Sequence, residues 1–299
     1  MKKKGSTQVS ARPAKEAVTR WAVSGVVLAL FWGALLYEYW PELASSVMRL
    51  FNSARSAGAE TVESRYFEVL NSSNASPRQL RAVVQELEGQ YEAVTGYLDV
   101  APTEPIPVLV VNGKGPGLPD GAQILINYDN GRMDTTLTPL MMVLLVEEIP
   151  INPAGGIAPA GGHALEVVEA AGLGDHLIRQ PLDAWVTLLR QENGYIPLQE
   201  AWKVGVPNDE ESLFYLIRAL LESGSFMRWF STSYGIDSSM RVAHGEPIES
   251  VSGQPLAELE RAWLKSLDGQ EIEPKSCEVV IPRASIFSIM CGKIRELPK

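Results

Sequence analysis

A short apolar segment between two prolines constrains this chain more than any other feature. The segment TPLMMVLLVEEIP occupies residues 138–150, with Thr138 as the predicted helix N-cap and Pro139 at the first helical position, where a missing N–H costs nothing. Because the run between the prolines is apolar on every side, we expect a central helix that is buried on all faces and ends at the second proline. Two adjacent carboxylates, Glu147 and Glu148, close the run and are the first candidates for chemistry.

The front of the chain predicts a membrane anchor. Residues 1–20 form a basic tail with six Lys or Arg and a single acid, and residues 21–40 carry no charge before Glu38. A helix of about 20 apolar residues spans the bilayer core, and aromatic residues lie at both ends of this one, as in interfacial anchors. A cleaved signal peptide is the rival interpretation, and it is weaker because bulky aromatic residues occupy the place of a cleavage site. A buried core helix is the third.

Charge asymmetry predicts the orientation and excludes one class of partner. The basic tail would stay in the cytoplasm, so we expect a single-pass protein of the cell membrane whose C-terminal domain is extracytoplasmic. The tail holds six of the 26 basic residues and one of the 36 acidic ones, which leaves 20 basic against 35 acidic residues in the remainder. A domain this acidic does not bind nucleic acid nonspecifically. The predicted partners are the membrane, through the one helix, and proteins outside the cytoplasm.

Beyond the anchor, the pattern predicts a stalk, one α+β domain and a short extension. Residues 41–60 keep helical spacing and then turn small and polar, residues 61–268 hold the domain, and residues 269–299 follow it. The domain opens with a strand, SRYFEVLNSS, and then an amphipathic helix capped by Ser76 with Pro77 at its first position. The segments PIPVLVVNG and AQILINYD predict two more strands.

Both cysteines of the chain, Cys277 and Cys291, lie in the extension. In an oxidising compartment they are candidates for a disulfide that closes a small β hairpin, worth about 3 kcal/mol in the chain-entropy model. Two unpaired thiols are the alternative if the topology is reversed. The pair lacks CxxC spacing, so it does not predict a metal site.

The order of these elements resembles the peptidase MA-like domains, which are the thermolysin-type or gluzincin domains, of bacterial membrane-anchored or exported proteins. RYFEV is similar to the opening strand, LEGQYEAVTGYLDV to the first helix, PIPVLVV to the edge strand and TPLMMVLLVEEIP to the active-site helix. The segments GYIPLQEAW, SLFYLIRALLESGSFMRWFSTSYG and GQPLAELERAWLKSL are similar to the helices that follow. The resemblance covers residues 63–267 and implies a small sheet followed by a helical half.

The resemblance also implies that the catalytic site is lost. A gluzincin binds zinc through His-Glu-x-x-His on one helix, with the Glu activating a water molecule. Here the motif falls on Glu147-Glu148-Ile149-Pro150-Ile151, so Glu147 and Ile151 replace both histidines, and Glu148 keeps the general-base position as a vestigial candidate. The implied protein is a pseudo-metallopeptidase without a cofactor. We therefore expect a non-catalytic binding or scaffold protein.

Two alternatives stay open. The segment HALEVVEAAGL offers Glu166 and Glu169 as counterparts of the third zinc ligand, and helical spacing puts His163 and Glu166 on one face. A zinc hydrolase with rearranged ligands would then use Glu148, His163 and Glu166. The other alternative is an accessory subunit of a larger membrane complex. The glycine- and proline-rich stretch 151–163 predicts a mobile or cleft-lining loop.

Overall fold

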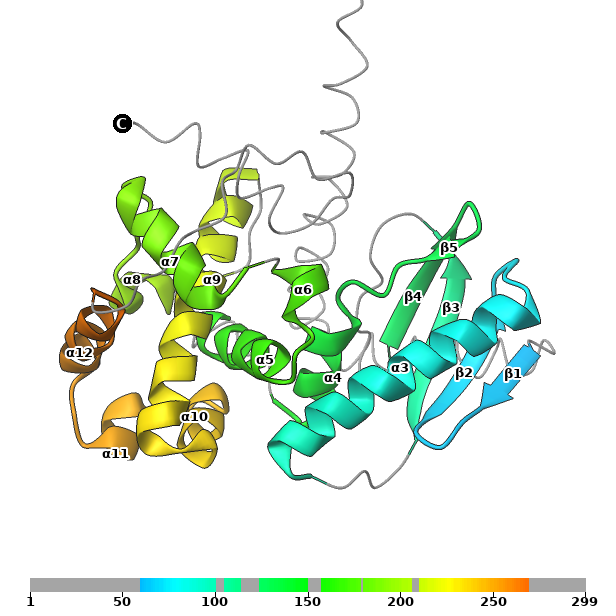
Figure 1. Ribbon diagram of the computed structural model, residues 1–299, viewed down its shortest axis with the longest axis horizontal. Helices are drawn as coiled ribbons and strands as arrows, with labels where there is room; N and C mark the ends of the chain where they lie inside the picture. The colour runs from blue at the N-terminus through cyan, green and yellow to red at the C-terminus, as the bar shows by residue number, and fades with distance from the viewer. Residues whose placement is uncertain are drawn as a thin grey trace, which may run out of the picture.

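The N-terminal half of the domain is built on a mixed β-sheet (Figure 1). The computed structural model describes residues 60–100, 105–113, 124–149, 157–178, 180–205 and 210–268. Within these residues, five strands follow one another in the order β1-β2-β3-β4-β5. They are β1 (Glu60–Glu63), β2 (Phe67–Ser72), β3 (Ile106–Asn112), β4 (Ile124–Asp129) and β5 (Arg132–Met133). The three central strands, which the sequence predicts, are parallel, and the two short edge strands, which it does not, pair antiparallel. The segment PIPVLVV, which the resemblance implies as an edge strand, is the middle strand β3, so that expectation is wrong.

Helix α3 (Pro77–Leu98) connects β2 to β3 and begins where the sequence predicts. The Ser76 side chain accepts a hydrogen bond from the backbone N–H of Gln79, and the Gln79 side chain accepts one from the backbone N–H of Ser76. This reciprocal capping box satisfies two of the amide donors that a helix start leaves free. The helix ends at Asp99, whose φ of 53° is left-handed.

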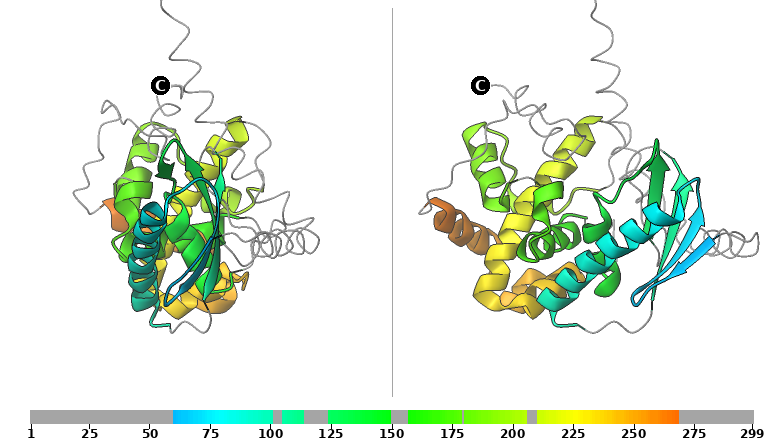
Figure 2. Two further views of the ribbon diagram at one scale, coloured as in Figure 1. Left: turned by 90° about the vertical axis from the view of Figure 1, so that its right-hand side faces the viewer. Right: turned by 45° about the vertical axis from the view of Figure 1, so that its right-hand side comes forward.

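One face of the sheet forms the first hydrophobic core with α3 and α4 (Thr138–Val146). Figure 2 shows α3 running along one side of the strands. Because side chains alternate along a strand, every second residue of the central strands points into this core. The buried strand residues of this face are Phe67, Val69, Val108, Val110, Ile124 and Ile126.

The C-terminal half is helical and is organised around α5 (Ala158–Ala170). All eleven residues from 158 to 168 are buried, so α5 is enclosed on every side. The other helices are α6 (Gly174–Leu177), α7 (Leu182–Gln191), α8 (Leu198–Ala201), α9 (Glu210–Tyr234), α10 (Ile236–Ala243), α11 (Ile248–Ser252) and α12 (Leu256–Asp268). The long helix α9 packs against α5, α7, α8 and α10.

The predicted loop at 151–163 is wrong over its second part, because residues 158–163 form the first two turns of α5. Its glycines serve packing. A Cβ on Gly162 would lie 2.5 Å from Ser223 Cβ and 2.7 Å from the Ser223 carbonyl carbon on α9. The missing side chain therefore lets two helix backbones approach closely. Residues 151–156 lie outside the described part of the chain.

The segment predicted as the central helix is a helix, but it is not the central one. Helix α4 includes Thr138, follows Leu137 as its N-cap, and ends at Val146, four residues before Pro150. Residues 141–143 are buried, whereas residues 144–146 are only partly so. The role of a helix buried on all faces belongs to α5, whose glycines and alanines let its neighbours close around it.

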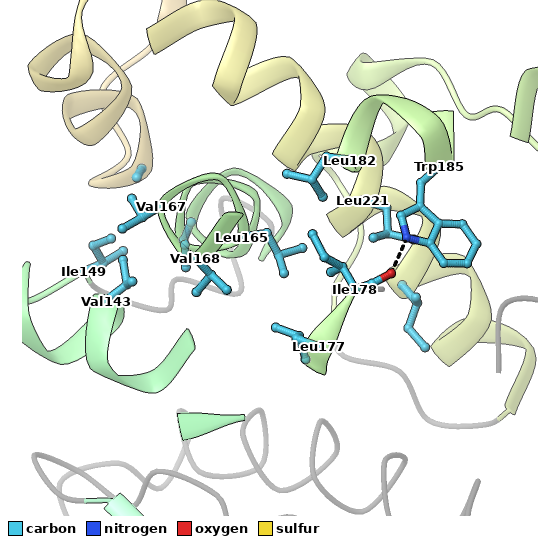
Figure 3. Close-up of a cluster of buried hydrophobic side chains, with 14 of the residues drawn as sticks. Val143, Ile149, Leu165, Val167, Val168, Leu177, Ile178, Leu182, Trp185 and Leu221 are labelled. Carbon is cyan, nitrogen blue, oxygen red and sulfur yellow. Dashed lines mark hydrogen bonds between the residues drawn. The ribbon is translucent and has the colours of Figure 1, made fainter. Parts of the chain in front are cut away.

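A second hydrophobic core joins the end of α4 to α5, α6, α7 and α9. Figure 3 shows Val143 and Ile149 facing Val167. In the same view the Trp185 indole donates a hydrogen bond of 2.9 Å to the carbonyl oxygen of Ile178. Leu182, Leu221 and Trp185 all lie in this core and are at most 1% exposed. The two halves of the domain therefore share a continuous apolar boundary along α4 and α5.

The fold class predicted from the sequence needs one correction. The structure is α+β, with a mixed sheet followed by helices, but no helix among the described residues is both long and apolar enough to cross a membrane. Helices α3 and α9 are long enough, but charged residues interrupt both. The predicted transmembrane anchor is therefore not supported. The segment 21–40 assigned to it, the tail 1–20, the stalk up to residue 59 and the extension 269–299 with Cys277 and Cys291 lie outside the described residues.

Candidate functional site

The two adjacent glutamates at the end of α4 have opposite environments. Glu147 is 8% exposed and caps the C-terminus of α4, whereas Glu148 is exposed. The backbone of Glu148 has a φ of 51°, in the left-handed region, and this turn points the side chains on either side of it inward. Ile149, the next residue, is again buried. One carboxylate of the pair is thus carried into the interior and the other into solvent.

The buried carboxylate meets His163 of α5. The imidazole is fully buried, and its Nε2 lies 2.8 Å from Glu147 Oε2. Its Nδ1 lies 3.0 Å from the hydroxyl of Ser239 on α10 and 3.4 Å from Glu166 Oε2, one turn along α5. Both ring nitrogens therefore have partners. We call the four residues Glu147, His163, Glu166 and Ser239, together with Tyr97, the histidine cluster.

The histidine cluster keeps a positive charge at its centre. Burial by itself lowers the pKa of His163, but the carboxylates of Glu147 and Glu166 raise it to about 9. At neutral pH the ring is therefore an imidazolium that donates from both nitrogens. Its charge offsets one of the two buried carboxylates, which otherwise would be strongly destabilising.

Tyr97, near the end of α3, completes the histidine cluster from the sheet half. Its hydroxyl donates a hydrogen bond of 2.7 Å to Glu166 Oε1. Burial and this hydrogen bond raise the pKa of the tyrosine well above its ordinary value. Tyr97 is 38% exposed, so it is the solvent-facing edge of an otherwise buried group of side chains. Through Tyr97 and Glu147 on one side and α5 and α10 on the other, the cluster bridges the two halves of the domain.

The structure brings together some of the predicted site residues and separates others. His163 and Glu166 do share one face of α5, as predicted. Glu148, the vestigial general base and predicted third member of a rearranged zinc site, is exposed, and Glu147 takes the place beside the imidazole. Glu169 belongs to a different network, where it accepts from the Leu182 backbone at 2.9 Å and pairs with an arginine of α9.

Tyr97 and Ser239 are members of the cluster that the sequence does not reveal. Ser239 is 76 residues from His163 along the chain, and Tyr97 is 69 residues from Glu166. Neither residue is at a position that the sequence marks as a candidate for chemistry, and each is an ordinary polar residue on a helix. Only the packing of α3 and α10 against α5 makes them neighbours.

The residues of the cluster do not fit a zinc ion. The 2.8 Å separation between His163 Nε2 and Glu147 Oε2 is a direct hydrogen bond, and a tetrahedral zinc would hold two ligand atoms about 3.3 Å apart. Within the described ranges, no group of three or more His, Cys, Asp or Glu side chains is arranged to hold a metal ion.

The cluster also contains a carboxylate, an imidazole and a hydroxyl in line, which is the chemical content of an acyl-transfer triad. Two properties disfavour that role. Ser239 is fully buried, so its hydroxyl does not meet a substrate, and its Oγ also contacts the sulfur of Met227 at 3.6 Å. An imidazolium cannot take a proton from the serine. The arrangement is suited to holding helices together.

No protein-family model, curated protein or solved structure matches this chain.

Proposed function

We propose that this chain is a non-catalytic binding or scaffold protein built on a peptidase MA-like arrangement. One observation carries the proposal: the polar side chains of the histidine cluster form their hydrogen bonds and ion pairs with one another. Both nitrogens of His163 have partners within the protein, and the imidazole, Glu166 and Ser239 are at most 1% exposed. Side chains paired in this way hold elements of the fold together.

The order of elements supports the peptidase-like arrangement. Two strands, the long helix α3 and three further strands are followed by the short apolar helix α4, and a second helix, α5, brings His163 and Glu166 against its end. In a metallopeptidase this junction carries the zinc ligands. In the proposed arrangement Glu147 corresponds to the first histidine of the motif, and what supports a structural role for it is the 2.8 Å contact between its Oε2 and His163 Nε2. We infer that this ion pair substitutes for the metal as the link between the two halves.

The partner we propose is a protein outside the cytoplasm. The acidic balance of the chain after residue 20 disfavours nucleic acid and anionic surfaces. A neutral or basic protein surface is the chemistry that remains.

The first test measures metal content and hydrolysis on the purified chain. We expect less than stoichiometric zinc by elemental analysis after dialysis, and no chelator-sensitive cleavage of unstructured peptides. About one zinc per chain, together with peptide cleavage that a chelator and His163→Ala both abolish, would overturn the proposal.

A second test addresses binding itself. Chemical cross-linking in the native cells, followed by purification through a C-terminal tag, should recover a stoichiometric protein partner. Recovery of the chain alone, under conditions in which known complexes of the same cells survive, would contradict a scaffold role.

A further inference from the structure

Three asparagines of the chain are each followed by glycine, and all three pairs lie at the end of a helix or strand. An asparagine before glycine is chemically labile, because the glycine nitrogen can approach the asparagine side chain with no side chain of its own in the way. The structure places this one reactive pair in three different environments. The pairs are Asn112-Gly113 at the end of β3, Asn130-Gly131 between β4 and β5, and Asn193-Gly194 after α7.

The reaction of such a pair exchanges an amide for an acid. The glycine N–H loses its proton, and the nitrogen forms a bond to the side-chain carbonyl carbon of the asparagine. Ammonia leaves with the side-chain nitrogen, and a cyclic succinimide remains. Water opens the ring at either carbonyl carbon, which gives aspartate or isoaspartate, so the net change is the gain of one water and the loss of one ammonia. The first step is fastest where the glycine N–H is exposed and donates no hydrogen bond, because a bonded N–H must first be released.

The pairs after β3 and α7 each hold their glycine N–H in a hydrogen bond. The Gly113 N–H donates to the carbonyl oxygen of Tyr128 at 3.1 Å. The Gly194 N–H donates to the carbonyl oxygen of Leu189 at 2.7 Å, and Gly194 is buried. Attack at either pair therefore requires a backbone hydrogen bond to break first.

The pair between β4 and β5 is open. Asn130 and Gly131 have φ angles of 50° and 82°, as the two central residues of a tight hairpin turn do. They join Asp129 to its strand partner Arg132 at the edge of the sheet (Figure 1), and both are exposed. Among the described residues, the Gly131 N–H donates no hydrogen bond. The Asn130 side chain donates to the Asp129 carboxylate at 3.0 Å, in a contact on the surface.

We propose that Asn130 is a modification site, at which the folded chain deamidates spontaneously and forms isoaspartate, and that this change loosens the first turn of α3. Tertiary structure selects the site, since it occupies the glycine N–H of the other two pairs and leaves that of Gly131 free. This inference does not depend on the proposed function.

The effect on α3 follows from one hydrogen bond. The carbonyl oxygen of Gly131 accepts a hydrogen bond of 2.9 Å from the side-chain amide of Gln79, the residue that forms the capping box with Ser76. Isoaspartate adds one carbon atom to the main chain directly before Gly131, so the tight turn is lost and this carbonyl oxygen moves. Aspartate adds a charge but leaves the main chain unchanged. Only the isoaspartate product therefore withdraws the support of the turn from the start of α3.

The first experiment follows all three pairs in one preparation of the full chain. The purified chain is incubated at mildly alkaline pH, and peptide mapping by mass spectrometry measures the loss of each amide with time. We expect Asn130 to react at least about fivefold faster than Asn112 and Asn193, because each of those pairs must first break a hydrogen bond. In denaturant the three rates should agree within about threefold, because the tertiary contacts are gone.

Two results of this experiment would overturn the proposal. One is a folded chain in which Asn112 or Asn193 reacts as fast as Asn130. The other is a folded chain in which Asn130 stays intact under conditions in which the denatured chain reacts at all three pairs.

The second experiment measures the product and its effect. A protein L-isoaspartyl methyltransferase with labelled S-adenosylmethionine should transfer methyl groups to the aged chain, in the peptide that contains residue 130. The matched control is Asn130→Asp, which carries the aspartate product without the extra main-chain atom. We expect amide exchange at residues 77–80 to be at least about threefold faster in the aged chain than in this variant. Equal exchange in the two, or methylation that maps to another pair, would contradict the proposal.

Discussion

Two sites in the helical half each bury carboxyl groups, and they differ in how the energetic cost of that burial is offset. In the histidine cluster, Glu147 accepts a hydrogen bond from the His163 imidazole, and Glu166 accepts one from Tyr97 through Oε1, while Glu166 Oε2 lies 3.4 Å from the same ring without a hydrogen bond among the described residues. On α9, Glu222 is also fully buried, but it accepts a hydrogen bond only from the Ile196 backbone, at 3.0 Å, and its second oxygen has no partner among the described residues. Burial raises the pKa of Glu222 well above its ordinary value.

The two sites differ in the cation that faces the carboxyl, which is an imidazole within hydrogen-bond distance in the histidine cluster and a guanidinium that donates elsewhere at Glu222. Glu222 has Arg218 one turn away, which lowers its pKa, but burial dominates and Glu260 acts in the same direction as burial. Arg218 itself donates to the carbonyl oxygen of Gly194 and stacks on Phe214. Burial therefore favours the protonated form of Glu222, whereas in the histidine cluster the two carboxylates favour the protonated form of the imidazole.

Removal of the base should produce the largest effect. His163→Ala leaves two buried carboxylates without their counter-charge, and we expect the free energy of unfolding to fall by about 3–5 kcal/mol. Denaturant unfolding followed by tryptophan fluorescence measures it. The matched control is His244→Ala, because His244 is exposed, and its loss should change stability by less than about 0.5 kcal/mol. Similar losses in both variants would refute the role of the buried ion pair.

Alkaline pH should weaken the histidine cluster without any mutation. The pKa of His163 is raised from 6.5 to about 9, so its contribution is complete below pH 6.5 and is lost as the pH rises through about 9. The shift corresponds to about 3 kcal/mol. Unfolding curves between pH 6 and pH 10 measure this loss, and His163→Gln should remove this part of the pH dependence. A wild-type curve that is flat in this range would contradict an imidazolium in the folded state.

Glu147→Gln and Glu148→Gln form a matched pair of variants, and we expect the first to cause the next largest loss of stability. Glu147→Gln keeps the shape but removes the charge beside His163 Nε2, and we expect a loss of about 2 kcal/mol. Glu148→Gln makes the same chemical change one residue later on an exposed side chain, so we expect less than about 0.5 kcal/mol. Thermal and denaturant unfolding at pH 7 compare them. A larger loss in Glu148→Gln would reverse the assignment of the two carboxylates.

Glu222→Gln should have the smallest effect at pH 7, and one of opposite sign. Because burial raises the pKa of Glu222, folding takes up a proton, and stability falls by at most about 1.4 kcal/mol per pH unit above the ordinary pKa of 4.5. The amide cannot ionise, so the variant should be more stable than the parent by about 1 kcal/mol at pH 7 and should lack this slope. Glu258→Gln, on the exposed surface of α12, is the control. A destabilised Glu222→Gln would show that the carboxyl is charged in the folded protein.

The sequence by itself determined the local elements of this domain. The capping box of Ser76 and Gln79 lies within four residues. Side chains in β2, β3 and β4 alternate between the two faces of the sheet with the period of two that is typical of strands. The shared face of His163 and Glu166 also follows from helical spacing alone. Each of these depends on interactions between neighbours in the chain, so their signals are present in the residues themselves.

Tertiary structure decided the features that join distant segments. The stretch 158–163 is rich in glycine and predicts a loop, yet it is helical because Gly162 allows α9 to pack directly on the α5 backbone. The left-handed turn at Glu148 selects Glu147 as the buried carboxylate, and α10 brings Ser239 to His163 from 76 residues away. No local pattern encodes these contacts, because they depend on the shape and charge of partners that only the folded chain assembles.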